Sequence, residues 1–460
     1  MLKKRLVNKI KRKEAKIAVI GIGYVGLPTA AILANLGFQV TGVDINPKIV
    51  NEVSQGRSHT HLPGLDKLIS KTHRQGNLKG TENALQAVSE ADITIVCVQT
   101  PLNKDRKPDL THLKKVCKSI AKVLTKGKLI VIQSTVPPKT TKDFVVPFLE
   151  EQSGLKCGMD FWLAYCPERM TPGSGLKDLA TNARIIGGYD SESAELGAEL
   201  FKIVTRGELW LTNLATAEVA KLAENTFRYV NVAFANELAL VCKEIGVDVA
   251  EVIKLANTHP RVNIHKPGCG VGGPCLRKDM SLLLNSTETE NFRPEIMSAS
   301  RRLNDYMPKH TAKLAVDALR KVGKSVENCK IAIFGTAYKG EVNDARNSPA
   351  EEIIRKLISL RARVVVYDPY CAESFGAKKT KDIMGAVRGA DCIIVTNDHK
   401  AFRELELPRI KALMNETPII VDGRRMINPK EAKMEGFIYI AIGYDTGLGV
   451  HTGKNTHAIS

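Results

Sequence analysis

The segment Lys16-Ile-Ala-Val-Ile-Gly21-Ile-Gly23-Tyr-Val-Gly26-Leu-Pro-Thr-Ala-Ala-Ile-Leu-Ala-Asn-Leu36 decides the fold. It opens with a short apolar run rich in β-branched residues, and after the glycines the stretch 27–36 has the composition of a helix. Gly37 ends this helix, and a second apolar run leads from Gln39 to Asp44. A strand, a glycine turn, a helix and a second strand in this order predict the first unit of a Rossmann-like parallel sheet.

The glycine turn predicts a dinucleotide site. Gly21, Gly23 and Gly26 allow a tight turn and a close approach of the backbone to a pyrophosphate, which free amides at the helix start would hold. Asp44 ends the next strand, where a carboxylate accepts hydrogen bonds from the adenosine ribose and repels a 2′-phosphate. This pattern favours NAD over NADP. The alternatives are a glycine turn that serves packing alone and an aspartate that only ends a strand.

The rest of the chain extends this plan. A length of 460 residues predicts two or three domains. Further strand candidates in the first block lie at 93–98, 129–133, 161–165 and 184–187, with helical stretches between them. The stretch 217–245 has neither Gly nor Pro and predicts one long helix, and a Gly/Pro-rich segment follows at 260–274.

The last block repeats the layout of the first, with a strand candidate at 330–334 followed by Gly335. We therefore expect an α/β chain in which two Rossmann-like parallel-sheet domains are joined by a central helical domain with a long helix. The predicted parts are a basic tail at 1–14, an NAD-binding Rossmann domain at 15–213, a central helical and dimerisation domain with a cysteine loop at 214–323, a C-terminal Rossmann-like domain at 324–445 and a tail at 446–460.

Composition limits the class of protein. The formal net charge is +18, and part of the excess lies in the first residues, which we interpret as a solvated tail or helix. No nucleic-acid motif accompanies this charge, so no nucleic-acid partner is expected. No apolar run could span a membrane and the N-terminus lacks the apolar stretch of a secretory signal, which predicts a cytoplasmic protein. The ten cysteines form no pair or cluster with metal spacing, which predicts reduced thiols and no metal.

The segment Pro267-Gly-Cys-Gly-Val-Gly-Gly-Pro-Cys-Leu-Arg-Lys-Asp279 is a second candidate site. Its glycines let a ligand approach the backbone closely. If a helix starts at Cys275, the helix dipole favours the thiolate. From these residues alone, a nucleophile and a buried inert thiol are equally good interpretations.

Eight segments, taken in order, resemble the UDP-glucose/GDP-mannose dehydrogenase family along nearly the whole chain. They are Gly21 to Gly26, Val98-Gln-Thr-Pro101, Ser134-Thr-Val-Pro137, Cys166-Pro-Glu-Arg169, Glu218-Val-Ala-Lys221 with Glu224-Asn225, Phe234-Ala-Asn-Glu-Leu238, Gly272-Gly-Pro-Cys275 with Lys278-Asp279, and Gly335-Thr-Ala-Tyr-Lys339 with Asp344-Ala-Arg-Asn-Ser-Pro349. Each segment is weak alone, and their shared order is specific.

The resemblance implies an NAD-dependent oxidation of the C6 alcohol of a nucleotide sugar to a carboxylate, through a thiohemiacetal and a thioester on one cysteine. It implies a UDP-sugar substrate and a homodimer or higher homo-oligomer formed through the central helices. The catalytic residues that it implies are Cys275, Lys221, Asn225, Asp279, Glu168 and Thr135. Those for the cofactor are Gly21, Gly23, Tyr24, Val25, Gly26, Asp44 and Thr100. Those for the substrate are Arg169, Lys221, Asn225, Arg261, Gly272, Lys339 and Arg346, with Arg424 as a weaker candidate.

The sugar is predicted from two motifs. Pro167-Glu-Arg-Met-Thr-Pro172-Gly and His259-Pro-Arg-Val-Asn263 resemble the branch that acts on UDP-N-acetylhexosamines, which favours UDP-N-acetyl-D-mannosamine. UDP-N-acetyl-D-glucosamine and UDP-glucose remain alternatives. Pro274, where that branch commonly has His, and Met280-Ser-Leu-Leu283 depart from its pattern, and Lys139 replaces a common Gly.

Other classes of protein fit less well. A two-electron dehydrogenase of the 6-phosphogluconate type would need neither Cys275 nor a second Rossmann-like domain. A non-catalytic nucleotide-sugar sensor would not need Lys221 and Asp279 beside that cysteine. A basic nucleic-acid-binding protein would show a steep dependence of binding on salt.

Overall fold

The computed structural model describes residues 1–460 except 61, 171–174, 287–291 and 446–460, so the predicted C-terminal tail lies outside the described residues. The chain divides into two compact units. Unit 1 comprises Met1–Glu224 and Ser281–Glu288, and unit 2 comprises Asn225–Met280 and Thr289–Ser460.

An eight-stranded sheet forms the centre of unit 1, in the order β3-β2-β1-β4-β5-β6-β7-β8. The strands are β1 (Lys16–Ile20), β2 (Gln39–Val43), β3 (Leu78–Thr81), β4 (Ile93–Val96), β5 (Leu129–Ile132), β6 (Trp162–Tyr165), β7 (Arg184–Gly188) and β8 (Leu209–Asn213). The first six pair in parallel in the order 3-2-1-4-5-6, which is that of a dinucleotide-binding Rossmann sheet. The predicted parallel sheet is confirmed for these six strands, and the exceptions are β7 and β8, which pair in parallel with each other and run antiparallel to β6.

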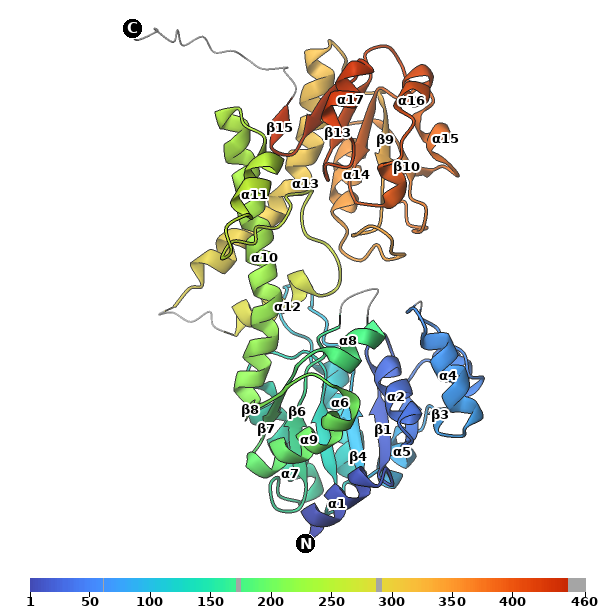
Figure 1. The fold of residues 1–460 in the computed structure, drawn as a ribbon, viewed down its shortest axis with the longest axis vertical. Coiled ribbons are helices and arrows are strands. Elements are labelled where there is room, and N and C mark those ends of the chain that lie inside the picture. Colours follow the sequence, from blue (N-terminus) through green and yellow to red (C-terminus); the bar gives the residue numbers. More distant parts are fainter. Residues whose placement is uncertain (61, 171–174, 287–291, 446–460) are drawn as a thin grey trace. The chain divides into compact units, whose positions relative to one another are not determined.

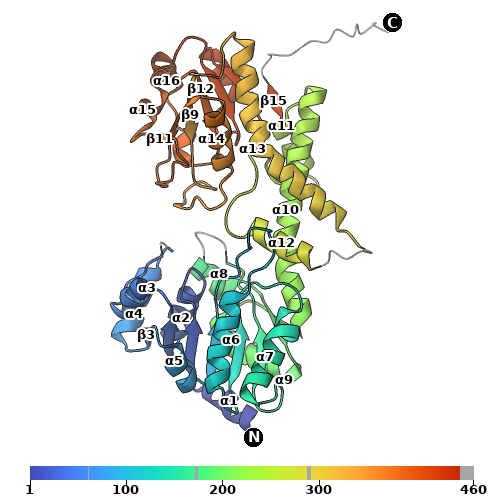
Figure 2. The same ribbon diagram turned by 180° about the vertical axis from the view of Figure 1, so that it is seen from behind.

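Two layers of helices cover this sheet (Figures 1 and 2). The helices are α1 (Leu2–Lys11), α2 (Gly26–Asn35), α3 (Pro47–Ser54), α4 (Leu65–Arg74), α5 (Ala84–Glu90), α6 (Thr111–Val123), the π-helical turn η1 (Thr141–Val145), α7 (Val146–Ser153), α8 (Gly175–Thr181) and α9 (Ser191–Val204). Alternate residues of β1 enter opposite cores. Ile17 and Val19 pack in the core that holds residues of α1, α2 and α9, whereas Ala18 and Ile20 pack in the core of α5, α6 and α7.

The basic N-terminal segment contains helix α1. Its Leu6 and Ile10, four positions apart, are buried in the same core as α9. Lys3 pairs with Glu195 of α9 at 2.8 Å, which adds a polar contact to the same helix. The segment is therefore an amphipathic helix, one of the two forms that its composition predicts.

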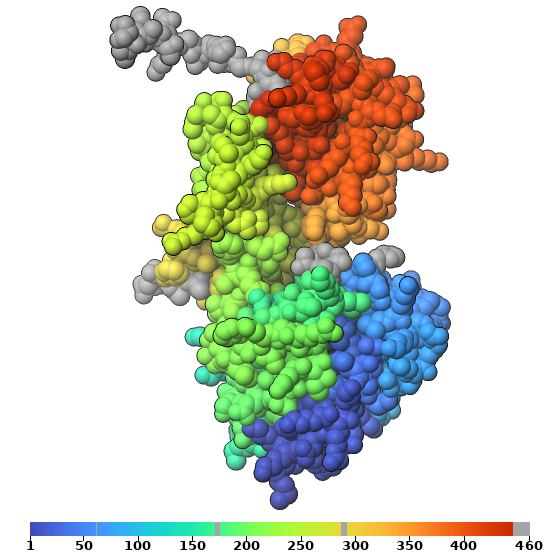
Figure 3. Space-filling model, in the orientation of Figure 1, coloured from blue at the N-terminus to red at the C-terminus, as the bar shows by residue number. Residues whose placement is uncertain are grey.

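Helix α10 (Leu214–Ile245) is the predicted long helix. Its 32 residues extend for about 48 Å, and the lack of Gly and Pro removes the usual causes of a break. The helix begins in unit 1, and its residues from Asn225 onward belong to unit 2. Its light-green surface is visible along much of its length in Figure 3.

Unit 2 contains the second Rossmann-like sheet, in the order β11-β10-β9-β12-β13-β14-β15. Its strands are β9 (Lys330–Phe334), β10 (Arg363–Tyr367), β11 (Lys378–Lys379), β12 (Cys392–Val395), β13 (Ile419–Asp422), β14 (Ile438–Ala441) and β15 (Tyr444–Asp445), of which only β15 is antiparallel to its neighbour. Its helices are α11 (Val249–Ala256), α12 (Leu276–Asn285), α13 (Glu295–Lys321), α14 (Pro349–Ser359), α15 (Ile383–Val387), the 3-10 turn η2 (Lys400–Phe402), α16 (Leu407–Leu413) and α17 (Pro429–Met434), with the end of α12 in unit 1. The predicted second parallel sheet is confirmed. No described helix has the length and hydropathy to cross a membrane.

Candidate active site

The glycine turn after β1 has the shape of a dinucleotide cradle. Gly21 has a φ of +88°, and its N–H donates to Val43 O at 2.8 Å, which joins the turn to β2. A Cβ at Gly26 would meet Gly21 O at 2.0 Å, so only glycine lets α2 start this close to the turn. A Cβ at Gly23 would meet no atom within 4 Å, which leaves open space where the pyrophosphate approaches. These residues fit NAD.

The other predicted cofactor residues lie around this cradle. Tyr24 is exposed and Val25 directly precedes α2. Asp44 follows β2 and is half-buried, and its Oδ1 accepts from Asn46 N at 3.0 Å. Thr100 follows β4, and its buried hydroxyl donates to Thr135 O. The sites therefore gather at the carboxyl ends of β1, β2, β4 and β5, where this fold binds its ligands.

The loops after β5 and β6 carry the predicted residues Thr135, Glu168 and Arg169, all half-buried. Ser134 Oγ donates to Val98 O at 2.7 Å, which ties the Thr135 loop to the segment after β4. Arg169 pairs with Glu224 of α10 at 2.7 Å and donates to Ala183 O at 2.7 Å. The side chain of Arg169 is thus held by two partners within unit 1.

Helix α10 carries Lys221 and Asn225 one turn apart, so both lie on one face of the helix. The Lys221 side chain is buried, which excludes the alternative of a solvated surface lysine. Asn225 Nδ2 donates to Asp279 Oδ2 at 2.6 Å, and the Asp279 carboxylate is also buried. Lys278 Nζ lies 3.5 Å from Asp279 Oδ1. In unit 2 the structure therefore brings together two predicted residues, Asn225 and Asp279.

Cys275 is the one exposed thiol among the ten cysteines, all of which lie in the described part of the chain. Helix α12 begins at Leu276, and Cys275 O accepts from Asp279 N at 2.8 Å, which places Cys275 at the N-cap. Burial raises the pKa of several other thiols, for example to about 12 at Cys117 and Cys157. Exposure and the helix start therefore distinguish Cys275 from the inert cysteines.

The cysteine loop is bound to the loop after β9. Gly273 has a φ of +86°, its N–H donates to Arg346 O at 2.9 Å, and Asn347 Nδ2 donates to Gly273 O at 3.2 Å. A Cβ at Gly272 would meet Asn347 O and Tyr338 Cβ at 2.8 Å each, so this close approach requires glycine. The structure thus brings Gly272 and Arg346 together.

The cations of unit 2 differ in their surroundings. The hydrogen-bonded carboxylate of Asp344 raises the pKa of Arg346, and Cys275 adds to this effect. Arg346 Nη2 lies 2.6 Å from Asp344 Oδ2, and Lys339 is exposed. Arg424 lies 3.6 Å from Asp398, and Arg261 is in the exposed turn after α11. Arg346 therefore has an electrostatic link to the cysteine.

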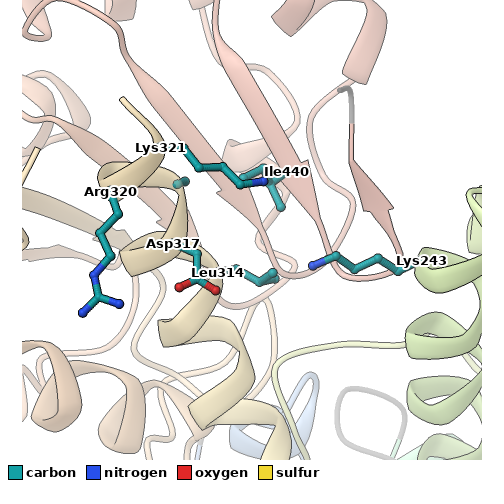
Figure 4. A pocket seen from close by; sticks show the side chains of 7 residues that line it. Lys243, Leu314, Asp317, Arg320, Lys321 and Ile440 are labelled. Atoms are coloured by element: carbon teal, nitrogen blue, oxygen red, sulfur yellow. The ribbon is translucent and has the colours of Figure 1, made fainter. Parts of the chain in front are cut away.

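A pocket on unit 2 is lined by residues that do not belong to the predicted site (Figure 4). Its residues are Lys243, Leu314, Asp317, Ala318, Arg320, Lys321 and Ile440. None of the predicted site residues is among them, so we assign no function to this pocket. The described residues contain no group of three or more metal-ligating side chains that could hold a metal ion.

Glu218 is a site residue that the sequence analysis missed. The carboxylate is completely buried on α10, one turn before Lys221, and accepts hydrogen bonds from Lys139 N and Thr141 N. Glu218 belongs to one of the family motifs, but the amides that its carboxylate binds lie far away in the chain. No spacing rule reveals such a contact.

Two Rossmann-like sheets, a cradle for NAD and an exposed cysteine at a helix start define a nucleotide-dependent dehydrogenase. Family models agree along the chain: the NAD-binding domain of the UDP-glucose/GDP-mannose dehydrogenase family matches residues 15–205, its central domain 215–306 and its UDP-binding domain 332–429.

Individual relatives agree with this class. The chain is 41% identical over 429 residues to a UDP-N-acetyl-D-mannosamine dehydrogenase of Pyrococcus horikoshii, which covers 93% of this chain and 99% of the relative. The solved structure of UDP-D-ManNAc dehydrogenase from that organism has a TM-score of 0.88 at 40% identity, again covering 93% and 99%. The crystal structure of an NDP-N-acetyl-D-galactosaminuronic acid dehydrogenase from Methanosarcina mazei Go1 has a TM-score of 0.84 at 34% identity, covering 95% and 98%.

The chain belongs to the UDP-glucose/GDP-mannose dehydrogenase family. It is an NAD-binding nucleotide-sugar dehydrogenase with a UDP-sugar-binding domain, as the sequence motifs predict.

Proposed function

We propose that this enzyme oxidises the C6 alcohol of UDP-N-acetyl-D-mannosamine to the carboxylate, with Cys275 as the covalent nucleophile. The observation that carries the proposal is the exposure of Cys275 at the N-terminus of α12, with the Arg346 guanidinium close enough to interact with it electrostatically. A helix N-terminus and a nearby cation both favour a thiolate. The names of the relatives support the choice of sugar.

The cysteine keeps the intermediate attached between two oxidations. The glycine turn at Gly21, Gly23 and Gly26 would hold NAD, which would supply the hydride acceptor for both oxidations. After the alcohol has become an aldehyde, the Cys275 thiolate adds to its carbon, and the oxygen takes up a proton to give a thiohemiacetal. Loss of the hydroxyl proton and the second hydride leaves a thioester. Water then adds to the carbonyl carbon, the C–S bond breaks, and the thiol and the uronate are released.

The oxygen on the reacting carbon gains negative charge when the thiolate and the water add. Lys221 and Asn225 share one face of α10 and are assigned to stabilise this charge. Because Asn225 donates to Asp279, the amide also orients that carboxylate for proton transfer or for positioning water. Glu168 and Thr135 are assigned to the water of thioester hydrolysis, and Thr135 also to the nicotinamide side of the site.

The residues assigned to the substrate are chosen by their charge and their position in the chain. Arg346 and Lys339 follow β9, at the carboxyl edge of the second sheet, and are assigned to the nucleotide sugar. Gly272 and Arg169 are assigned to the sugar. Arg261, exposed after α11, is assigned to the site of a neighbouring subunit, which requires a homodimer or a larger homo-oligomer.

A substrate panel tests the choice of sugar. NADH production would be followed at 340 nm with UDP-N-acetyl-D-mannosamine, UDP-N-acetyl-D-glucosamine, UDP-N-acetyl-D-galactosamine, UDP-glucose and GDP-mannose. We expect the highest kcat/KM with UDP-N-acetyl-D-mannosamine. A higher kcat/KM with UDP-glucose or with another N-acetylhexosamine would overturn the substrate and leave the family chemistry in place.

A further inference from the structure

Glu218 joins two parts of unit 1 that are distant in sequence. Its Oε2 accepts from Lys139 N at 2.6 Å and its Oε1 from Thr141 N at 2.8 Å. The side chain is completely buried, and burial raises its pKa to about 7, against the opposing effect of these hydrogen bonds. A buried carboxylate with two amide donors is well satisfied, whereas the amides would be left without an acceptor if it were removed.

The segment that Glu218 holds is strained. Lys139 has a φ of +67°, a left-handed conformation that a lysine rarely adopts without outside support. Thr141 begins the π-helical turn η1, another uncommon backbone form. The two hydrogen bonds of Glu218 therefore stabilise a backbone conformation that the local sequence does not favour.

The strained segment belongs to the loop that begins at Thr135, and helix α10, which carries Glu218, also carries Lys221. Thr135 lies four residues before Lys139, and its carbonyl accepts a hydrogen bond from the hydroxyl of Thr100. Glu218 and Lys221 are three positions apart on α10, so they lie side by side on the helix. One buried carboxylate thus connects the loop of Thr135 to the turn of Lys221.

We propose that Glu218 is a positioning residue that sets the place of Thr135 relative to Lys221, and so controls the rate of the reaction without touching the substrate. The proposal rests on the roles assigned above to Thr135 and Lys221. It predicts that the loss of one acceptor oxygen slows turnover and leaves the binding of the nucleotide sugar unchanged.

Kinetics of Glu218→Gln and Glu150→Gln test the proposal. Glu150 of α7 is the matched control, because its Oε1 also accepts a backbone amide of unit 1, from Cys157 at 3.0 Å, at a place with no predicted site residue. With the sugar that the wild type oxidises, Glu218→Gln should lower kcat roughly 30-fold and change KM less than about two-fold, since small misplacements cost about this much. The control should keep kcat. A wild-type kcat in Glu218→Gln, or an equal loss in both variants, would overturn the proposal.

A rescue variant separates positioning from general damage to the fold. Glycine adopts a φ of +67° without strain, so Lys139→Gly should restore part of kcat to Glu218→Gln. No gain in the double variant, with both proteins folded by circular dichroism, would contradict the positioning role.

The pH profile adds a readout that a purely structural residue would not move. Lys221 lies one turn away from Glu218 on the same helix and Lys139 donates its backbone N–H to Glu218, whereas Asp143 in η1 adds to the rise of the pKa of Glu218. Protonation removes an acceptor, so the wild type should lose kcat as pH falls through about 7. The variant with glutamine should lack this step, and retention of the step would count against the proposal.

Hydrogen exchange tests the anchor without any substrate. The peptide that contains Lys139 and Thr141 should exchange faster in Glu218→Gln than in the wild type. Unchanged protection would overturn the proposal even if no sugar of the panel were oxidised. Faster exchange with no turnover of any sugar would instead point to a failure of the proposed function.

Discussion

The contact between Asn225 and Asp279 places an amide against a buried carboxylate. The 2.6 Å hydrogen bond supplies a donor to a carboxylate that is removed from water. Lys278 contributes a cation at 3.5 Å from the other oxygen. The hydrogen bonding of Asp279 therefore depends on the type of residue at position 225.

Asn225→Asp is expected to slow the enzyme in a pH-dependent way. The introduced carboxylate would lie against that of Asp279, and a like charge at this distance favours the protonated form of the introduced aspartate. We expect kcat to fall roughly 100-fold at pH 8. The ratio of variant to wild-type kcat should change with pH between 5 and 9.

Asn225→Ala is the control for this variant. It removes the donor without adding a charge, so its ratio to the wild type should stay flat over the same pH range. A flat ratio for Asn225→Asp would contradict the direct contact of residue 225 with Asp279.

Among the elements, helix α1 is held by a small number of contacts. Leu6 is buried against the core shared with α9, and Lys3 pairs with Glu195. Residues 1–14 precede the region that the family model matches. The helix therefore contributes to the stability of unit 1 through its own apolar face.

Leu6→Ala should destabilise unit 1 and leave catalysis unchanged. Truncation of a buried leucine costs about 2–5 kcal/mol, less if α1 detaches instead of leaving a cavity. Thermal unfolding followed by circular dichroism should show a lower Tm, with KM and kcat at wild-type values. Leu2→Ala, at a position that is 38% exposed, is the control. Equal Tm values for both variants would refute the packing of α1.

Helix α13 contains a buried histidine that is kept neutral. Burial, with repulsion from Lys243 and Lys313, lowers the pKa of His310 to about 4. The unfolded chain takes up this proton near pH 6.5 and the folded chain does not. The free energy of unfolding should therefore fall as pH drops from about 6.5 to about 4, by up to about 3 kcal/mol.

His310→Phe should remove this part of the pH dependence. The ring can still pack on Tyr306, whose centroid lies 5.7 Å from that of His310. Urea unfolding at pH 7.5 and pH 4.5 would give the difference in free energy for both proteins. If the variant loses as much stability as the wild type over this interval, His310 does not titrate in the proposed way.

Buried strands could be predicted from the sequence more easily than edge strands. The predicted strand at 330–334 coincides with β9, and β4 ends at Val96 instead of Val98. No sequence pattern predicts β3, which contains Gly80 and buries only Leu78, or β8, whose residues are not buried. Such strands are defined by pairing with β2 or β7, not by their own composition.

The site could be predicted where chemistry is local in sequence. The glycine turn and the cysteine loop carry their signal in a few consecutive residues. The contacts of Glu218 and of Arg346 with backbone groups of distant loops exist only in the folded chain. Residue types and spacing predict which side chains react, whereas packing decides which residues hold them in place.

At the scale of the whole molecule, α10 presents an apolar stripe. Phe227, Phe234 and Val241 follow each other at seven-residue intervals and are 67%, 52% and 46% exposed. A spacing of seven places them on one side of the helix. Large exposed apolar residues in such a row are typical of an interface, which supports the proposed homo-oligomer.

Phe234→Glu should weaken this oligomer. A charge in the centre of the stripe would have to be buried on association, which is costly. Light scattering after size exclusion should give a dimer or larger species for the wild type and a smaller mass for the variant. Arg228→Glu, at an exposed charged position of the same helix, is the control. A monomeric wild type would contradict the assignment of Arg261 to a neighbouring subunit.

The stoichiometry of NADH per nucleotide sugar, for the wild type and Cys275→Ser, tests the central claim most directly. With the sugar limiting and NAD in excess, the wild type should form two NADH per sugar. Cys275→Ser should form the uronate at least about 1000-fold more slowly, because serine is a poor nucleophile without an activating base. Turnover of Cys275→Ser at the wild-type rate with two NADH per sugar would contradict covalent catalysis by Cys275.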